Sequence, residues 1–574
     1  MFAALCFLLL AGQTCAQCLS LPNAFSTQLE QADKILEGKV IGQQSFLDEN
    51  GNIFTQNAIE VYRVFKGDLE FSTNVITEGG VFGDLMQVVT PSAQLQIGDY
   101  GVLVLGSDEQ RNVSDLASSF IQINEQNNSV FGLKEITERE HLYDAIARTT
   151  GSNQIHLLRM PMGEVSSSRS TPQINSVYPL EVTAGTKTLI TISGQGFGEN
   201  QENSRVAFHN ADDGGQSFVE LNSGPHYVSW SDTEIQIYVP SSTLYNTAVA
   251  GTGSIRVIKG NGSVTESESH LTVDYAKSEV VYSEILNETM LVGVQQGGYE
   301  FKINQNLLTL LGGPELAAKS IEKWACNTGA NFNLSEGLTA ATEFAQDDIS
   351  VIGLSNPGQF PNYLLGRTVT TFSSCGTPNG LQWNLIEVDI LLNRDINWWL
   401  TEDAPTESTF DIETALLHEL GHAHLLQHNN DPSSPMYFEL TAGTARRDLH
   451  AEADIEGGQF VSYSSAEANH TCSAEYHQLY DFSSCNLSVI NDVDEAETNS
   501  FLAFPNPFVN ELSLSASWLA GAEYSIIDAT GRLVLSDVLN ATSNSIQVSS
   551  LSKGVYLLRI ESEGKVVAQH IVKN

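Results

Sequence analysis

The stretch that decides the fold lies at residues 418–428 and reads His-Glu-Leu-Gly-His-Ala-His-Leu-Leu-Gln-His. His418 and His422 are four residues apart, which on a helix of about 3.6 residues per turn places both imidazoles on one face. Glu419 follows His418 directly, so its carboxylate can reach a water molecule on a metal that the two histidines hold. This spacing is typical of zinc hydrolases, in which the metal and a general base together activate water. The sequence therefore predicts a zinc site on a helix.

The residues around this motif indicate where the helix starts and which face it buries. The apolar residues at helical spacing are Ile412, Leu416, Leu420 and Ala423, and they predict a buried face away from the histidines. Ser408, followed three residues later by Asp411, resembles a capping box and predicts the start of the helix. On a continuous helix, at about 100° per residue, His428 would lie about 80° away from His418. His428 can therefore join the same metal only if the helix ends and the chain turns back.

With a third histidine at this spacing and a methionine eight residues after it, the segment resembles the matrixin-like branch of the metzincins. The zinc ligands implied by the resemblance are His418, His422 and His428. Glu419 would be the general base, and Met436 would form a structural turn beneath the metal.

Segments upstream resemble the same family. The strand Val388-Asp389-Ile390-Leu391-Leu392, with Trp398 after it, resembles the family's edge strand. This resemblance implies that the strand holds a peptide substrate by strand addition. Residues 299–304, and a helix with Ala317, Ile321 and Trp324 on one face, resemble the start of the catalytic domain, which we place at 280–485.

One position departs from the family pattern, which has glycine where this chain has Leu425. A left-handed conformation at a non-glycine residue costs about 1–2 kcal/mol, which a folded domain tolerates. His428 is favoured as the third ligand because Met436 keeps its family spacing from it. In the alternative, the turn is shifted and a carboxylate completes the site, since zinc also accepts carboxylates. The candidates are Glu452, Asp454 and Glu456, and His424 is interpreted as a neighbour on the wrong face.

Composition and charge limit the class of protein. At 574 residues the chain is too long for a single core. Its 69 acidic and 27 basic residues give a net charge of −42. This balance argues against nucleic acid and anionic membranes as partners, because phosphate binding needs clustered Lys and Arg. Residues 1–16 resemble a secretory signal peptide, and no later stretch is predicted to be a transmembrane helix.

The cysteines that remain after signal cleavage are expected to form disulfides in an oxidising compartment. The predicted pairs are Cys472 with Cys485 and Cys326 with Cys375, which leaves Cys18 over. Residues 374–378 also resemble the matrixin pro-segment switch, whose cysteine blocks zinc. Because this stretch lies inside the predicted catalytic domain, we interpret the likeness as coincidence.

Two β-rich domains are predicted before the catalytic domain. Residues 17–163 contain short β-branched segments separated by Gly, Asn and Asp. Through Cys18, residues 32–40 and Phe65-Lys66-Gly67, they resemble netrin and metalloprotease-inhibitor modules, which are OB-like barrels. One hypothesis is that this domain docks on the catalytic cleft and restrains it; an accessory domain without such contact is the favoured alternative. Residues 173–275 resemble an IPT/TIG domain, an immunoglobulin-like sandwich, through segments 177–179, 194–198 and 228–232.

The last segment, residues 500–574, resembles the C-terminal sorting domain of the type IX (Por) secretion system. The resemblance rests on residues 504–508, 531–534, 551–558 and 571–574. It implies a small β-sandwich that the type IX secretion machinery binds. It also implies a Gram-negative cell, with export through the periplasm to the outer surface or the medium, and commonly removal of the sorting domain.

The predicted fold is multidomain: a β-rich N-terminal domain, an immunoglobulin-like β-sandwich, an α+β metzincin catalytic domain and a C-terminal β-sandwich. The predicted function is a secreted, Zn²⁺-dependent endopeptidase acting on a protein or peptide substrate. The alternative is a cell-surface adhesion or scaffold protein with an inactive metalloprotease-like domain. Asp347 and Asp348 are interpreted as a solvated loop, with structural Ca²⁺ binding as the alternative.

Overall fold

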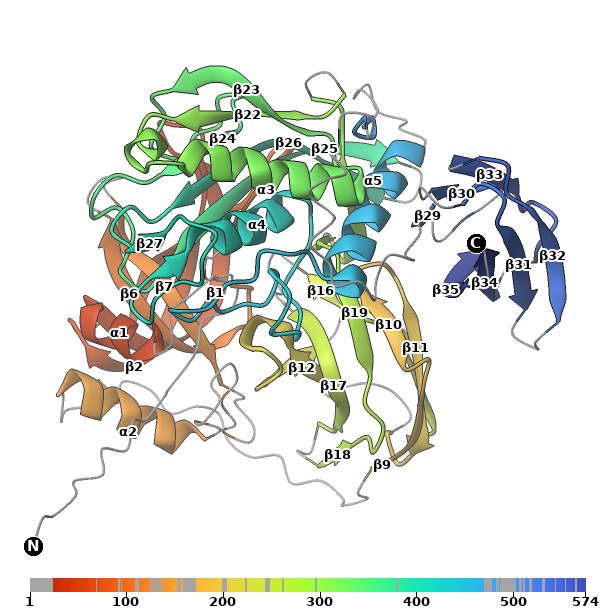
Figure 1. Cartoon of the computed structure of the whole chain (residues 1–574). Helices are drawn as coiled ribbons and strands as arrows, with labels where there is room; N and C mark the ends of the chain where they lie inside the picture. The colour runs from red at the N-terminus through yellow and green to blue at the C-terminus, as the bar shows by residue number, and fades with distance from the viewer. Residues whose placement is uncertain are drawn as a thin grey trace, which may run out of the picture.

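The computed structural model describes residues 24–157, 172–468, 477–485 and 502–573, with short gaps inside these ranges. Figure 1 shows β-rich units in chain order: a barrel, a sandwich, a larger layered unit and a C-terminal sandwich. The predicted signal peptide and Cys18 lie outside the described residues.

The N-terminal unit is a barrel. Strand β1 pairs with β2 and β6, β6 pairs with β7, β7 with β3, and β3 with β2, so these strands form a closed ring. Its elements are α1 (Ala24–Gln31), β1 (Lys34–Leu47), β2 (Ile53–Lys66), β3 (Ser72–Glu78), β6 (Tyr100–Asp108), β7 (Val113–Gln122), α2 (Arg139–Thr150) and β8 (His156–Leu157).

Two strands of the N-terminal segment leave this barrel. They are β4 (Gly80–Phe82) and β5 (Leu85–Thr90), which lie between β3 and β6 in the sequence. Strand β4 pairs with β5, and β5 pairs antiparallel with strand β25 of the layered unit. The N-terminal segment therefore contributes edge strands to the sheet of the layered unit, whose other strands follow the sandwich in the chain.

The second unit is a β-sandwich with an apolar core between its sheets. One sheet has the order β14-β15-β11-β9, and the other is built around β13, β12 and β17. Strand β16 pairs with both β17 and β20, so the second sheet continues into the layered unit. The elements are β9 (Gln173–Tyr178), β10 (Glu181–Ala184), β11 (Leu189–Gln195), β12 (Arg205–Asn210), η1 (Ala211–Asp213), β13 (Phe218–Leu221), β14 (Tyr227–Trp230), β15 (Glu234–Tyr238), β16 (Ser241–Ser242), β17 (Ala248–Ile258), β18 (Val264–Glu266) and β19 (Thr272–Ala276).

The layered unit is built on a mixed sheet in the order β23-β22-β24-β26-β25-β5-β4. Its first four strands run parallel to one another, whereas β25 runs antiparallel to β26. Strand β26 is buried along most of its length, as expected for a strand covered on both faces. The strands are β20 (Glu279–Tyr282), β21 (Ile285–Leu291), β22 (Tyr299–Asn304), β23 (Phe332–Thr339), β24 (Val351–Leu354), β25 (Gly366–Thr377), β26 (Gly380–Leu392), β27 (Trp398–Trp399) and β28 (Phe410–Asp411).

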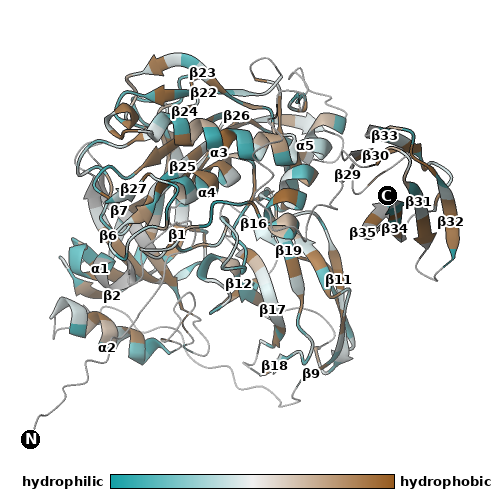
Figure 2. Ribbon diagram, viewed as in Figure 1, coloured by the Kyte–Doolittle hydropathy of each residue, from teal (hydrophilic) through white to brown (hydrophobic). Residues whose placement is uncertain are grey.

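Helices α3 (Gly313–Thr328) and α4 (Ile412–Ala423) pack on one face of this sheet. In Figure 2 apolar and hydrophilic stretches alternate along α3 and the neighbouring strands. Ile390 belongs to the core under the helices and its neighbour Leu391 to a second core, because successive strand residues point to opposite faces. Trp324 of α3 donates its indole N–H to the Leu417 carbonyl of α4 at 2.9 Å. The remaining elements are η2 (Leu307–Thr309), the π-helix η3 (Ala451–Ile455) and α5 (Glu456–Glu467).

The disulfide pairing differs from the prediction. Cys326, on α3, is bonded to Cys485 with a Cα–Cα distance of 5.8 Å. The predicted pairs Cys326–Cys375 and Cys472–Cys485 are therefore wrong. Sequence spacing favoured a short loop, whereas the fold brings Cys485 back to α3. Cys375 is also disulfide-bonded, which agrees with its interpretation as something other than a free zinc-blocking thiol.

The C-terminal unit is a small antiparallel sandwich around its own apolar core. One sheet has the order β29-β30-β33 and the other β32-β31-β34-β35. The strands are β29 (Leu502–Phe504), β30 (Glu511–Ser515), β31 (Glu523–Asp528), β32 (Leu533–Val538), β33 (Ser543–Gln547), β34 (Gly554–Ser562) and β35 (Lys565–Lys573).

Candidate metal centre

Helix α4 carries the HExxH motif and is buried along its whole length. It begins after Asp411, whose carboxylate accepts hydrogen bonds from the N–H and the hydroxyl of Thr414 at 2.9 and 2.8 Å. The predicted cap at Ser408 is wrong, because the short chain segment before the helix is the strand β28 and Asp411 is the N-cap residue. Such a cap satisfies a backbone donor that the first helical turn leaves free.

The turn after α4 brings the chain back toward His418 and His422. Leu425 adopts the left-handed conformation, with φ of 60°. Its N–H donates to the His422 carbonyl at 3.0 Å, and the Leu426 N–H donates to the Gly421 carbonyl at 2.9 Å. This is the Schellman pattern of helix termination, with leucine at the position where glycine is usual. The helix ends as the placement of His428 near the other histidines requires.

The returning segment is held by the junction between the sandwich and the layered unit. The Ser278 N–H donates to the Leu425 carbonyl at 2.7 Å, and the Gln427 N–H donates to the Ala276 carbonyl at 2.8 Å. These bonds fix the backbone that leads into His428. The position of this histidine therefore depends on the end of the second unit as well as on α4.

The three motif histidines meet in a buried cluster. The Nε2 atom of His418 lies 3.1 Å from Nε2 of His422 and 3.3 Å from Nε2 of His428. All three side chains are at most 4% exposed. Within the described part of the chain, these residues form a group whose ligand atoms lie within 4.8 Å of one another. Three converging imidazole nitrogens are a donor set that Zn²⁺ accepts.

Each histidine also has a partner for its other ring nitrogen. A hydrogen bond at Nδ1 places the proton there and leaves the lone pair of Nε2 directed into the cluster. Burial and the neighbouring imidazoles lower the pKa of His418 well below its ordinary value. Burial also lowers the pKa of His422 and of His428 to about 3, so all three are neutral, as metal ligands must be. The partners are the Pro435 carbonyl for His418 at 2.8 Å, the Leu426 carbonyl for His422 at 3.0 Å and the Asp212 carboxylate for His428 at 2.9 Å.

Glu419 lies between the helix and strand β25. The Thr368 hydroxyl donates to its carboxylate at 2.6 Å. Burial raises the pKa of Glu419 to about 8, while the Thr368 hydroxyl and the nearby Arg367 oppose this rise. A side chain at Gly366 would bring its Cβ within 2.6 Å of the Glu419 carboxylate, so the strand comes this close because of glycine. A pKa near neutrality suits a group that takes and returns a proton.

Met436 packs against the helix behind the histidines. It is 1% exposed, and a Cβ at Gly421 would lie 2.1 Å from its sulfur. Its own N–H donates to the Ser434 hydroxyl at 2.9 Å, which holds the turn. The structure thus places Met436 beside α4, and its role as a structural turn beneath a metal stays a prediction.

Asp454, one of the three alternative carboxylate ligands, is engaged elsewhere. The Asp454 carboxylate accepts hydrogen bonds from the Ser434 hydroxyl and the His450 N–H, each at 2.7 Å. His424 contacts the rings of Trp324 and Phe332 and hydrogen-bonds the Ser462 hydroxyl at 2.8 Å. His424, interpreted from the sequence as a neighbour on the wrong face, is thus buried among aromatic and polar groups of the core.

The strand predicted to hold substrate is not an edge strand. Residues Val388–Leu392 lie in β26, and residues 389–392 pair with β24 on one side and with β25 on the other. The edge position that the family resemblance implied is therefore wrong, because a likeness in one strand does not reveal which strands pair with it. Strand β25 is the next strand outward, and its Thr368 touches Glu419.

The acidic loop at Asp347 and Asp348 is hydrogen-bonded to strand β26. The N–H groups of both residues donate to the Glu387 carboxylate at 3.1 and 2.5 Å. The Asp347 carboxylate accepts the Ile349 N–H at 3.0 Å. These bonds give the loop a structural role and do not test the calcium alternative.

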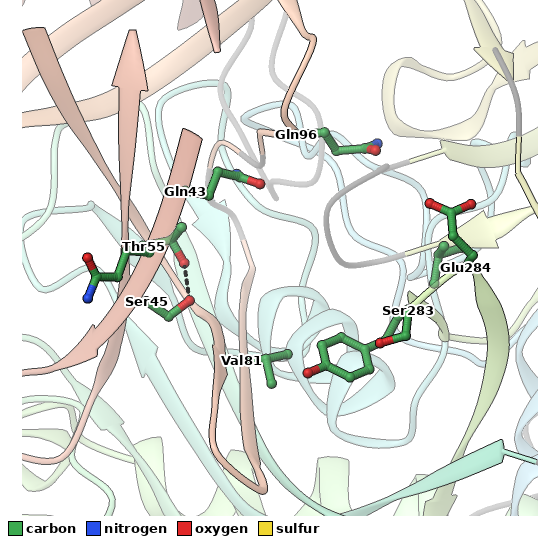
Figure 3. Close-up of a pocket in the computed structure, with 10 residues that line it drawn as sticks. Gln43, Ser45, Thr55, Val81, Gln96, Ser283 and Glu284 are labelled. Atoms are coloured by element: carbon green, nitrogen blue, oxygen red, sulfur yellow. Dashed lines mark hydrogen bonds between the residues drawn. The ribbon is translucent and has the colours of Figure 1, made fainter. Parts of the chain in front are cut away.

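A separate cavity of about 410 Å³ lies between the barrel and the hairpin of β20 and β21. Figure 3 shows Ser45 and Thr55 of the barrel on one side, joined by a 3.0 Å hydrogen bond, and Ser283 and Glu284 on the other. Its lining contains none of the predicted site residues.

Two residues of the candidate site were missed by sequence reasoning. Thr368 lies on a strand rich in Thr and Ser, which carries no motif, and Asp212 lies in the sandwich domain. The partners are 51 residues from Glu419 and 216 residues from His428, respectively. Only the folded arrangement of the units shows them.

Parts of the chain match known families. Residues 172–275 match the IPT/TIG domain, which confirms the predicted immunoglobulin-like domain, and residues 502–574 match the secretion system C-terminal sorting domain. Metalloendoproteinase 2-MMP of Arabidopsis thaliana is 28% identical over 163 residues, which cover 27% of this chain and 38% of that protein. The chain thus spans well under two thirds of this relative.

Comparison with solved structures adds no argument about the fold. The BSP domain of a biofilm associated protein gives a TM-score of 0.12 at 11% identity, covering 93% of this chain and 81% of that one. PorZ, a surface component of the type-IX secretion system of Porphyromonas gingivalis, gives 0.13 at 9% identity, covering 94% and 100%.

The sorting domain sets the destination of the protein. It implies interaction with the type IX secretion machinery. None of the helices in the described ranges combines the length and apolarity needed to cross a bilayer. The chain is thus a multidomain, β-rich protein with an IPT/TIG domain and a secretion sorting domain, exported to the cell surface or the extracellular space.

Proposed function

We propose that this chain is a secreted zinc-dependent endopeptidase of matrixin-like type, whose catalytic domain spans about residues 280–485. The observation that carries the proposal is the convergence of three neutral imidazole nitrogens on α4 and the turn after it, next to a buried carboxylate. The partial similarity to a metalloendoproteinase and the sorting domain support it.

The geometry supports a proposed role for each residue of the site. His418, His422 and His428 would hold Zn²⁺ through Nε2, with each Nδ1 bonded to an acceptor. When bound, zinc would act as a Lewis acid that lowers the pKa of water toward neutrality and stabilises negative charge on a carbonyl oxygen. Glu419 would take the proton of the attacking water and pass it to the leaving amine. Thr368 orients the Glu419 carboxylate through its 2.6 Å hydrogen bond.

The test combines zinc content with cleavage of an unfolded protein substrate. We expect about one zinc per wild-type chain, loss of zinc in His422→Ala, and retained zinc in Glu419→Gln with cleavage reduced by about 10²–10⁴-fold. Glu407→Gln, an exposed residue before α4, is the matched control and should behave as wild type.

Because the N-terminal segment reaches the layered unit, cleavage is assayed before and after site-specific cutting at a protease site inserted within residues 164–171. Zinc binding without Glu419-dependent cleavage in either preparation would contradict the proposed function and favour a scaffold with an inactive domain. Chelation followed by zinc addition should abolish and restore the activity.

A further inference from the structure

The hydrogen bond between the IPT/TIG domain and His428 assigns that domain a part in the metal centre. The Asp212 carboxylate lies 2.9 Å from Nδ1 of His428, and both side chains are at most 2% exposed. The other two histidines use backbone carbonyls of the layered unit. One ligand of the centre is thus oriented by a charged side chain from another domain.

Asp212 is itself held in place. It lies in the short helix η1, where the Asn210 side chain accepts its backbone N–H at 3.0 Å. The same turn packs on the loop after His428, since a Cβ at Gly214 would come within 2.6 Å of the Tyr437 hydroxyl. The Asn430 side chain donates to the Thr252 carbonyl of the sandwich at 3.4 Å. The domain contact around this hydrogen bond is therefore close and specific.

We propose that Asp212 is a positioning residue for the metal centre: it fixes the tautomer and ring orientation of His428, so that the IPT/TIG domain is a working part of the catalytic unit. This proposal rests on the proposed function. A carboxylate partner at the outer nitrogen orients an imidazole ligand and raises its basicity, and loss of such partners typically costs about 10–100-fold in metal affinity. No role as a mere spacer would produce that effect.

The test measures zinc affinity of the full chain by competition with a chromophoric chelator. We expect Asp212→Asn to weaken zinc binding by about 10–100-fold, and Asp212→Ala by at least as much. Asp213→Asn is the matched control, because this buried neighbour accepts the N–H groups of Gln216 and Ser217 and does not serve the histidine. The melting temperature of each zinc-free variant measures damage to the domain, and Asp212→Asn should lose no more stability than Asp213→Asn.

Several outcomes separate the ideas. Unchanged zinc affinity in both Asp212 variants, or an equal loss in Asp213→Asn, would overturn the positioning role while leaving the zinc site intact. A wild-type chain that binds no zinc would instead contradict the proposed function. If Asp212→Asn does not fold, the tautomer of His428 in the wild-type chain decides the matter, because the proposal requires the proton on Nδ1 in its ¹⁵N NMR signal.

A second inference comes from the pairing of β5 with β25. Six residue pairs join them, from Thr368 with Thr90 to Ser373 with Leu85. Side chains reinforce the strand pair: the Arg367 guanidinium contacts both oxygens of Glu78 at 2.9 Å, and the Gln87 amide donates to the Thr371 hydroxyl at 3.3 Å. The strand that touches Glu419 therefore has its outer backbone edge occupied by the N-terminal segment.

We infer that β5 occupies in cis the edge on which an extended peptide would add to β25, so that the intact chain is latent. Peptides bind exposed sheet edges by main-chain hydrogen bonds, and an edge already paired has none to offer. The inference rests on the proposed function. It gives physical content to the hypothesis that the N-terminal domain restrains the cleft.

Strand β5 is packed into the core, so the test weakens its attachment by a substitution in the N-terminal segment. Met86 and Val88 of β5 belong to the core of the layered unit. The test therefore uses Glu78→Gln, which weakens the contact to Arg367, together with the cut within residues 164–171. We expect this combination to raise cleavage at least 10-fold over the intact chain. Glu49→Gln, an exposed carboxylate of the same barrel, is the control.

A binding measurement keeps this inference testable even without catalysis. A fluorescent peptide of residues 84–90 should bind the cut Glu78→Gln chain carrying Glu419→Gln, and should bind the intact chain at least 10-fold more weakly. A scrambled peptide should bind neither. Equal binding to both chains, absence of binding to the loosened chain, or an intact chain as active as the loosened one would refute latency.

Discussion

Leu425 combines an unfavourable backbone with a favourable side chain. Its left-handed conformation costs about 1–2 kcal/mol. The side chain is 1% exposed and lies in the main core, where burial of a leucine contributes about 1.5–3 kcal/mol and its deletion also leaves a cavity. The free energy gained by burying the side chain outweighs the cost of the left-handed backbone. This accounts for leucine at a position where the family that the chain resembles has glycine.

We expect Leu425→Ala to lower the free energy of unfolding by about 2–5 kcal/mol. Leu425→Gly loses the same packing but relaxes the backbone, so it should be more stable than the alanine variant by about 1 kcal/mol. Urea unfolding of the zinc-free chain measures both. At Leu420, within α4, the order should be reversed, because glycine is the poorer helix residue. If Leu425→Gly is no more stable to urea than Leu425→Ala, the backbone strain at this position is refuted.

The residue-scale features of the site could be predicted only in part. The spacing of His418, His422 and His428 predicted a cluster because ligands on one helix and its turn are close in sequence. Asp212 and Thr368 escaped, since each reaches the site from a segment that the sequence places far away. The start of α4 was predicted at Ser408, whereas the observed N-cap is Asp411. Both residues have capping side chains, and only the path of the backbone decides which one caps the helix.

At the scale of elements, the sheet shows what periodicity can and cannot predict. The strand at residues 388–392 was predicted from its family resemblance, but its pairing on both sides depends on neighbours that carry no strong signal. Strand β25 is rich in Thr and Ser, and β5 is a six-residue segment in a domain expected to fold by itself. In the N-terminal segment, by contrast, the β-branched segments predicted a β-rich domain, and its strands pair mostly with one another.

Strand β26 should also make stability depend on pH. Burial raises the pKa of Glu387 to about 8, against the hydrogen bonds from the loop backbone. The folded state therefore binds more protons than the unfolded state between the ordinary pKa and 8, so the stability from this group is present in acid and lost as pH rises through 8. We expect Glu387→Gln to reduce the fall in urea midpoint between pH 5 and pH 8. Glu343→Gln, on an exposed loop position, should leave that fall unchanged.

At the scale of the whole molecule, distant segments are joined covalently and by shared sheets. The disulfide Cys326–Cys485 closes a loop with a sequence separation of 159. We expect Cys485→Ser to lower the free energy of unfolding by about 2–5 kcal/mol, because the cross-link restricts the unfolded chain. Cys326→Ser should cost the same, and the double variant should cost no more than either single one. Additive losses in urea unfolding would show that the two cysteines act separately.

The same disulfide bears on what happens when the sorting domain is removed. Cys485 precedes that domain, and residues 478 and 480 donate backbone hydrogen bonds to the Gly297 and Gly329 carbonyls at 2.7 and 3.0 Å. After a cut at any peptide bond between Cys485 and residue 502, the new carboxyl-terminal segment is still held to α3 by the disulfide at Cys485. Removal of the sorting domain would thus leave the end of the remaining chain anchored to the layered unit, whichever of these bonds is cut.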